Sequence, residues 1–214
     1  MGEITPINFI QKTLNREDIQ CYYQDEMFKQ AINSISDIEI DDKPSLRNRG
    51  IYLEFGLFVG TTAKKIIQYI PKDKYLYGFE GFCGLENDVT PEGLKGITAL
   101  CGEMPEYPKQ VKVIVGKLQD SLPQFLRWHG EDIAFINFDV SSVTVKDALF
   151  ILADSKRLKK GTVITICHAI KLLNRISYDS IYKSFIESVE AFNIKYEYIC
   201  FGDVHIAIKL IEDV

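Results

Sequence analysis

Glu54, Gly56, Gly60 and Glu80 are the residues whose types and spacing are best suited to hold a small molecule. An apolar run ends in Glu54-x-Gly56-x-x-x-Gly60, and an amphipathic helical pattern begins directly afterwards at Thr61. Glycines let a backbone approach a ligand closely, and a helix N-terminus offers unpaired N–H donors. About twenty residues after this turn a second apolar run ends in Glu80, whose carboxylate can accept both hydroxyls of a ribose. The pattern predicts a strand–turn–helix–strand unit that binds a nucleoside ligand.

The spacing of the glycines separates two classes of nucleoside-binding protein. It is not the G-x-G-x-x-G of dinucleotide-binding enzymes. With one glycine fewer and an acid two residues before the first, Glu54-x-Gly56-x-x-x-Gly60 resembles motif I of class I S-adenosylmethionine (SAM) methyltransferases.

Strands and helices alternate from Gly50 onward, which indicates an α/β fold with a mostly parallel sheet. Apolar runs predict seven strands: 51–55, 75–79, 111–115, 133–139, 162–167, 195–200 and 205–210. Helical patterns between them cover 61–69, 118–128, 143–158 and 178–192. Only residues 201–204 separate the last two strands, too few for a crossover helix, so these strands must form an antiparallel hairpin. The expected fold class is a Rossmann-like, seven-stranded methyltransferase fold.

Residues 1–49 are expected to form an N-terminal helical cap, with a helix from about Gln24 to Ser34, in front of a SAM-binding domain over 50–214. The cap has two roles open to it: packing over a ligand site, or making the contact of a homodimer. The segment 81–108 is rich in glycine and proline and long for a connection, which is typical of a functional loop.

Charge and composition exclude several classes of partner. The net charge of −5 disfavours nucleic acid, since such proteins need a basic face. The basic run 156–160 is interpreted as the solvated end of a helix. No apolar run has the length of a membrane span, and the five cysteines contain no C-x-x-C pair. We therefore expect reduced thiols, a cytoplasmic location, and neither nucleic acid nor membrane as partner.

Four segments, in order, resemble the macrocin O-methyltransferase family, whose members methylate hydroxyls on sugars of natural products. Residues 77–85 are similar to the family's Y-G-F-D-S-F-E-G-L, and residues 113–123 are similar to its V-x-G-x-F-x-D-T-L-P. Residues 133–139 are similar to its strand that ends in an aspartate, and residues 161–164 to its G-G-x-I strand.

The resemblance implies roles in binding the methionine half of SAM. Gly56 and Gly60 would wrap this half, Thr61 would contact its carboxylate, and Glu54 would lie near its ammonium group. An ordinary strand-end carboxylate is the alternative interpretation of Glu54.

Other residues are expected at the adenosine half. Glu80 would bind the ribose hydroxyls, and Phe79 would border the adenosine pocket, although an aromatic residue at this place is more often part of a core. Gly116 and Asp120 would lie by the adenine edge.

The sequence departs from the family at its metal site. Asp139 matches the first metal-binding aspartate, but Ser141 replaces the second acid, and Cys167 and His168 stand where the next strand should end in an acidic pair. Mg²⁺ prefers hard oxygen ligands, so one aspartate should hold it poorly.

Three explanations stay open. In the first, His168 is a general base in metal-free chemistry, and Asp139 orients it or the acceptor. In the second, a softer metal binds through Asp139, Cys167 and His168. In the third, catalysis has been lost. His129 and His205 are interpreted as structural.

The sequence thus predicts a SAM-dependent O-methyltransferase that needs no metal and acts on a hydroxyl of a small molecule, by resemblance a sugar or glycan. The alternative is an inactive protein of the same fold that serves as a binding or regulatory partner.

Overall fold

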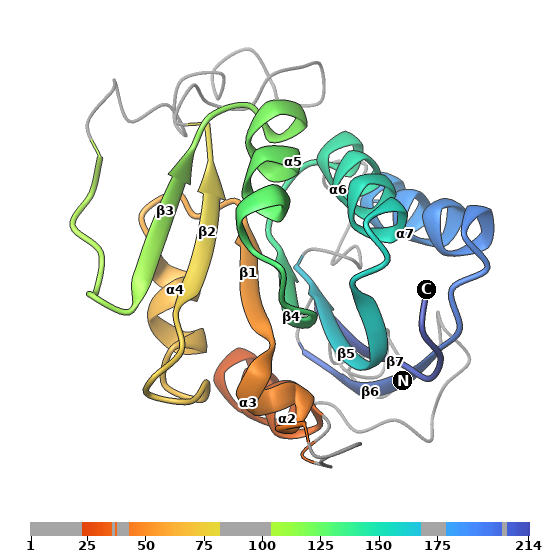
Figure 1. Cartoon of the computed structure of the whole chain (residues 1–214), viewed down its shortest axis with the longest axis horizontal. Helices are drawn as coiled ribbons and strands as arrows, with labels where there is room; N and C mark the ends of the chain where they lie inside the picture. The colour runs from red at the N-terminus through yellow and green to blue at the C-terminus, as the bar shows by residue number, and fades with distance from the viewer. Residues whose placement is uncertain (1–22, 36, 38–42, 82–103, 168–178, 203–204) are drawn as a thin grey trace, which may run out of the picture.

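A single seven-stranded sheet forms the centre of the molecule (Figure 1). The structure is a computed structural model and describes residues 23–35, 37, 43–81, 104–167, 179–202 and 205–214. The strand order is β3-β2-β1-β4-β5-β7-β6. The strands are β1 Ile51–Phe55, β2 Leu76–Glu80, β3 Val111–Val115, β4 Ile133–Phe138, β5 Leu158–Ile166, β6 Tyr196–Phe201 and β7 Ile206–Leu210.

Helices cover both faces of this sheet. Figure 1 looks onto the face that carries α5 (Leu118–Trp128), α6 (Ser142–Asp154) and α7 (Asp179–Ala191). The opposite face carries α2 (Gln24–Asn33), α3 (Leu46–Arg49) and α4 (Thr61–Ile66).

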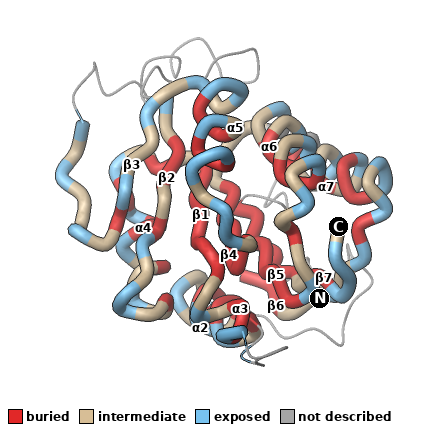
Figure 2. The backbone as a smooth tube through the Cα atoms, viewed as in Figure 1, coloured by how far each residue is buried: buried red, intermediate tan, exposed pale blue. Residues whose placement is uncertain are grey.

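The central strands β1 and β4 are buried along their whole length, as the red tube in Figure 2 shows. Successive side chains of a strand point to opposite faces, so each strand supplies two cores. Leu53, Phe55 and Ile136 pack beneath α5, α6 and α7. Tyr52 and Phe135 pack with α2 and α4. Burial on both faces explains why these strands read as continuous apolar runs.

The last two strands confirm the predicted antiparallel hairpin. β7 pairs antiparallel with both β6 and β5, and it lies between them. β1, β2, β3, β4 and β5 pair in parallel with one another, in the order that the sheet gives. The predicted fold class is therefore confirmed.

Two predicted helix ends are wrong. The helix expected over 61–69 ends at Ile66. The helix expected to run to Leu158 ends at Asp154, and β5 begins at Leu158. Leu158 is fully buried and pairs with Ile133, so burial outweighs the basic residues that follow it. The basic run 156–160 is thus not a helix end, because its second half belongs to β5. There the Lys159 ammonium lies 3.5 Å from the Asp213 carboxylate.

The helix predicted near Gln24 is present as α2, and it packs in the core on the opposite face of the sheet from α5, α6 and α7. Met27, Phe28, Ala31 and Ile32 are fully buried there. The short helix α3 lies between α2 and β1. The division into a cap and a SAM-binding domain stays a prediction.

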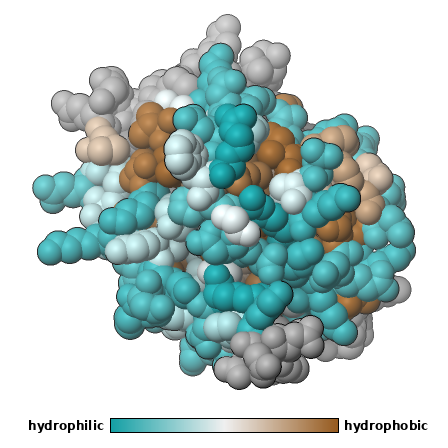
Figure 3. Space-filling view, in the orientation of Figure 1, coloured by the Kyte–Doolittle hydropathy of each residue, from teal (hydrophilic) through white to brown (hydrophobic). Residues whose placement is uncertain are grey.

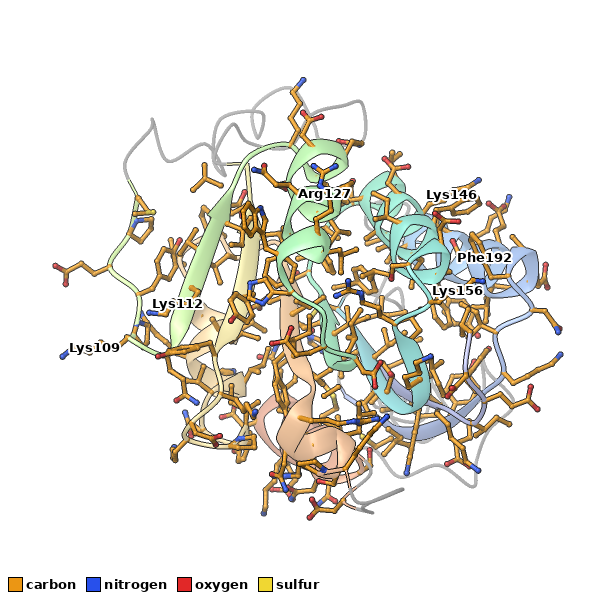
Figure 4. All side chains as sticks on the ribbon, in the orientation of Figure 1. Lys109, Lys112, Arg127, Lys146, Lys156 and Phe192 are labelled. Atoms are coloured by element: carbon orange, nitrogen blue, oxygen red, sulfur yellow. The ribbon has the colours of Figure 1, made fainter. Side chains whose placement is uncertain are left out.

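The surface on the side of α5 and α6 is largely hydrophilic, with separate hydrophobic patches (Figure 3). On this side the rings of Phe192 and Phe150 meet edge-to-face at 4.7 Å between centroids, and Lys112 lies 4.6 Å from the Tyr75 ring centroid (Figure 4). None of the helices in the described ranges is both long and apolar enough to cross a bilayer.

Candidate functional site

The turn after β1 has a backbone shape that its glycines make possible. Gly56 and Gly60 have φ of 87° and 73°, a region that favours residues without a Cβ atom. A Cβ atom on Gly56 would lie 2.1 Å from the Asp139 carbonyl oxygen, so only glycine lets the tips of β1 and β4 approach this closely. Thr61 is exposed and is the first residue of α4.

The Glu80 carboxylate lies against this turn. Oε2 accepts a hydrogen bond from the Phe58 N–H at 2.8 Å, and Oε1 accepts one from the Gly81 N–H at 2.9 Å. The acid at the end of β2 is therefore held by the backbone of the turn after β1. Each carboxylate oxygen has a second lone pair with which it can accept a further bond. The sequence pattern correctly paired this acid with the glycine turn.

Tyr107 is a residue of this site that the sequence reading missed. Its hydroxyl donates a hydrogen bond to the Phe58 carbonyl oxygen. Burial raises the pKa of Tyr107 to about 12, and the Glu80 and Glu54 carboxylates add to the effect. No local signal marks this residue, because it reaches the turn from the segment before β3.

Glu54 belongs to a buried polar row beneath the turn. Glu54, Asn137 and Thr165 are direct neighbours in the register of β1, β4 and β5. The Asn137 amide donates to Glu54 Oε1 at 3.0 Å, while its oxygen accepts from the Thr165 hydroxyl at 2.8 Å. Polar residues at matching positions of three apolar strands were the signal that could have revealed this row.

The environment of Glu54 favours its neutral form. Burial raises the pKa of Glu54 to about 8, and the Asn137 amide and Thr62 hydroxyl counteract burial only in part. Oε2 has no hydrogen-bond partner among the described residues. Glu54 is fully buried behind the turn, and its predicted contact with a ligand ammonium stays a prediction.

Asp139 follows the end of β4, where its backbone N–H donates to the Phe55 carbonyl at 2.9 Å. Its carboxylate accepts a long hydrogen bond, 3.4 Å, from the Thr62 hydroxyl at the start of α4. Asp139 thus lies at the edge of the sheet beside the glycine turn, and its role in orienting His168 or the acceptor stays a prediction.

Two residues that stand where the macrocin O-methyltransferase family has acids, Ser141 and Cys167, have structural partners. The Ser141 hydroxyl caps α6 by accepting from the Thr144 N–H at 3.4 Å. Cys167 is buried, its Sγ lies 3.5 Å from Asn137 Oδ1, and burial raises the pKa of its thiol well above the usual range. A protonated thiol is a poor metal ligand. Nowhere in the described ranges do three His, Cys, Asp or Glu side chains gather closely enough to hold a metal ion.

The residues expected near adenosine lie at different depths. Phe79 is 4% exposed and stacks on Phe55 at 5.0 Å between centroids, so it belongs to the core. Gly116 follows β3 with φ 139°, and its N–H donates to the Glu80 carbonyl at 3.2 Å. Asp120 is exposed in the first turn of α5. The ligand roles of all three stay predictions.

The structure describes only some of the remaining predicted features, which are the candidate base, the long loop and the two histidines interpreted as structural. His168 and most of the 81–108 loop lie outside the described residues. His129 stacks on Phe125 at 4.1 Å between centroids. His205 is buried, and its Nε2 lies 3.0 Å from the side-chain nitrogen of Gln24.

Comparison with solved structures places the fold among methyltransferases. No protein-family model and no curated protein matches the chain. The O-methyltransferase NovP aligns over 87% of this chain and 78% of its own, at 14% identity and a TM-score of 0.57. CalS11, a TDP-rhamnose 3′-O-methyltransferase, aligns over 86% and 77% at 16% identity and 0.56. TomG from Streptomyces achromogenes, solved with SAM, aligns over 99% and 100% at 14% identity and 0.52. The chain therefore has the Rossmann-like fold of these O-methyltransferases.

Proposed function

We propose that the protein transfers a methyl group from SAM to a hydroxyl of a small molecule. The observation that carries the proposal is the Glu80 carboxylate bound to the Phe58 N–H within a glycine turn. This arrangement brings to one edge of the sheet a glycine turn and the carboxylate that we propose as the acceptor for the ribose hydroxyls. The structural similarity to TomG, solved with SAM, gives further support.

Each part of the cofactor has a candidate partner. Glu80 would accept hydrogen bonds from the two ribose hydroxyls, and Thr61 would meet the methionine carboxylate at the start of α4. Gly56 and Gly60 would let the turn wrap the methionine half, since their φ of 87° and 73° is the left-handed backbone conformation that this turn needs. Gly116 and Asp120 would border the adenine.

Calorimetry with SAM and with S-adenosylhomocysteine (SAH) tests the cofactor. Glu80→Ala removes a charged acceptor and should weaken binding by roughly 1.5–3 kcal/mol. Glu197→Ala removes an exposed glutamate of β6 and should leave the affinity unchanged. An unchanged affinity in Glu80→Ala excludes the ribose role, and preferential binding of NAD refutes the cofactor itself.

The acceptor is proposed to be a sugar or glycan hydroxyl. The resemblance to the macrocin O-methyltransferase family supports this class, and so does the structural similarity to CalS11. Incubation with SAM and a panel of sugar, nucleotide-sugar and phenolic acceptors, followed by mass spectrometry, tests it. Products that gain a methyl only on phenols would refute the sugar assignment.

We propose that His168 takes the proton of the acceptor hydroxyl. When bound, SAM would supply a methyl group on a positively charged sulfur: the acceptor oxygen would bond to the methyl carbon, and the electron pair of the broken carbon–sulfur bond would stay on sulfur as a neutral thioether. Asp139 would orient His168 or the acceptor, and alignment of the reacting atoms would supply most of the rate.

The pH dependence of turnover tests the base. Turnover should rise with pH through an apparent pKa of about 6.5, the ordinary value for histidine. His168→Asn should lower turnover by roughly 10²–10⁴-fold, and SAM affinity should stay the same. Near-normal turnover with a flat pH profile in this variant removes His168 from the mechanism.

Chelation tests the proposed independence from metal. Activity should survive EDTA, because Ser141 and Cys167 replace two carboxylates of the family's metal site. A loss that Mg²⁺ restores would show that Asp139 recruits other oxygen ligands. Restoration by Zn²⁺ alone would favour the Cys167–His168 site.

A second candidate is an inactive protein of this fold that acts as a binding partner. It is favoured by Ser141 and Cys167, which serve the cap of α6 and the buried polar row where the family has metal ligands. SAM binding without turnover on any acceptor would support it. A cytoplasmic location, a homodimer and the absence of nucleic-acid and membrane partners stay predictions from the sequence.

A further inference from the structure

Phe58 has a backbone conformation that its neighbours must maintain. Its φ is 42°, in the left-handed region, which is unfavourable for a residue that carries a Cβ atom. Unlike Gly56 and Gly60 in the same turn, Phe58 has a large side chain. Such conformations persist when surrounding contacts determine them.

Two contacts hold the Phe58 backbone from opposite sides. Its N–H donates to Glu80 Oε2 at 2.8 Å, and its carbonyl accepts from the Tyr107 hydroxyl. Both backbone polar groups of the residue are therefore used. Rotation of the Phe58 backbone toward an ordinary conformation would break or bend both hydrogen bonds.

The ring of Tyr107 makes a second contact with the turn. A Cβ atom on Gly60 would lie 2.8 Å and 2.9 Å from two carbon atoms of the Tyr107 ring. The ring therefore lies directly on the Cα of Gly60, just before α4. Tyr107 holds the turn through its hydroxyl at Phe58 and through its ring at Gly60.

The segment that carries Tyr107 is itself anchored. The Val111 N–H donates to the Pro108 carbonyl at 2.8 Å. The Gln110 side-chain amide donates to the Pro71 and Lys74 carbonyls at 3.0 Å and 2.9 Å. Tyr107 therefore projects from a segment fixed at the start of β3, and it can act as a rigid support.

We propose that Tyr107 is a positioning residue of the cofactor site: by holding the Phe58 carbonyl, it keeps the Phe58 backbone in the conformation in which the N–H is directed at Glu80. The proposal rests on the proposed function, because it assigns Glu80 to the ribose. Holding Oε2 at Phe58 and Oε1 at Gly81 sets the plane of the carboxylate before the ligand arrives. The binding site then needs less reorganisation when SAM or SAH binds.

Binding measurements with SAH test the link between Tyr107 and Glu80. Tyr107→Phe keeps the ring on Gly60 and removes only the hydroxyl, and it should weaken SAH binding roughly three- to tenfold. Tyr75→Phe is the matched control, since Tyr75 is 45% exposed at the start of β2, and it should not change the affinity. In a Glu80→Ala background the same Tyr107→Phe change should alter affinity less than twofold, because the group that it positions is absent.

Hydrogen exchange without ligand tests the positioning directly. Amides of residues 56–62 should exchange faster in Tyr107→Phe than in wild type or Tyr75→Phe, with similar unfolding temperatures for all three. Unchanged SAH affinity, or an equal loss in both backgrounds, overturns the proposal, as does unchanged exchange. A wild-type protein that binds neither SAM nor SAH refutes the proposed function separately, and exchange still decides whether Tyr107 fixes the turn.

Discussion

Glu54 is a carboxyl group whose surroundings make its ionised form unfavourable. It is fully buried, one oxygen is bonded to Asn137, and the other has no hydrogen-bond partner among the described residues. Burial raises its pKa to about 8, far above the ordinary 4.5. The folded protein therefore retains a proton on Glu54 at pH values where the unfolded chain has released it.

Stability should consequently fall as pH rises from about 5 to about 8. In this window the unfolded state binds fewer protons than the folded state, so unfolding releases a proton and becomes easier with rising pH. The slope should approach about 1 kcal/mol per pH unit, below the limit of about 1.4 for one group. Denaturant titrations of wild type and Glu54→Gln at several pH values measure it, and the difference between the two proteins isolates this residue.

Glu197→Gln, on the exposed side of β6, should keep the wild-type pH slope. If Glu54→Gln keeps it as well, Glu54 is ionised in the folded protein and the burial argument is wrong.

Single residues of the site were predictable to different extents. Glu80 and the glycines follow from local spacing, because strand, turn and helix are contiguous in the chain. Tyr107 meets Phe58 across 49 positions, and nothing in its neighbours indicates the contact. Asn137 is intermediate, since its role depends on the register of three strands, which the apolar pattern alone does not fix.

Gly56 fixes the distance between β1 and β4 at the elements' carboxyl ends. Gly56→Ala combines a φ of 87° with a Cβ atom 2.1 Å from the Asp139 carbonyl oxygen, which is backbone and must move. We expect a loss of roughly 2–4 kcal/mol in the free energy of unfolding, as for other strained or overpacked sites.

Gly130→Ala is the matched control for this change. A Cβ atom at Gly130 would meet nothing within 4 Å. Its effect should stay within about 0.5 kcal/mol. Comparable losses for the two variants would show that the close approach at Gly56 has no energetic importance.

Element positions were predicted well where a periodic pattern was flanked by glycines. This holds for β1, which lies between Gly50 and Gly56, and for α5, which lies between Gly116 and Gly130. The helix–strand boundary near Leu158 was not, because Lys156, Lys159 and Lys160 are also typical of a helix end. Lys156 takes a φ of 57° just after α6 and turns the chain into β5. The boundary depends on pairing with β4, which no local pattern contains.

At the scale of the whole molecule, α2 is a structural part of the sheet's second core. Among the described residues before Gly50, five large apolar side chains are buried, each 4% exposed or less: Met27, Phe28, Ile32, Ile35 and Leu46. At about 1.5–3 kcal/mol for each side chain, the stabilisation lost with them would be comparable to the usual net stability of about 5–15 kcal/mol. Residues 50–214 alone should therefore fail to unfold cooperatively.

Circular dichroism during thermal unfolding of this fragment and of the full chain tests the expectation. Within the full chain, Phe28→Ala should cost about 3–5 kcal/mol, whereas Lys29→Ala, on the exposed side of α2, should change little. A fragment that folds cooperatively and binds SAH would instead support the predicted division at residue 49.

Two cysteines of the described ranges are buried, and their chemical reactivity can report when the molecule opens. The Cys167 and Cys200 side chains are each 1% exposed, on the face of the sheet that α2 covers, and the Cys200 Sγ lies 3.8 Å from the Met27 carbonyl of that helix. An alkylating reagent can reach them only when this layer opens. With Cys21, Cys83 and Cys101 replaced by serine, the rate of modification at Cys200 reports how often α2 leaves the sheet. The rate at Cys167 reports openings that reach the buried polar row beneath the glycine turn, where its Sγ lies beside Asn137.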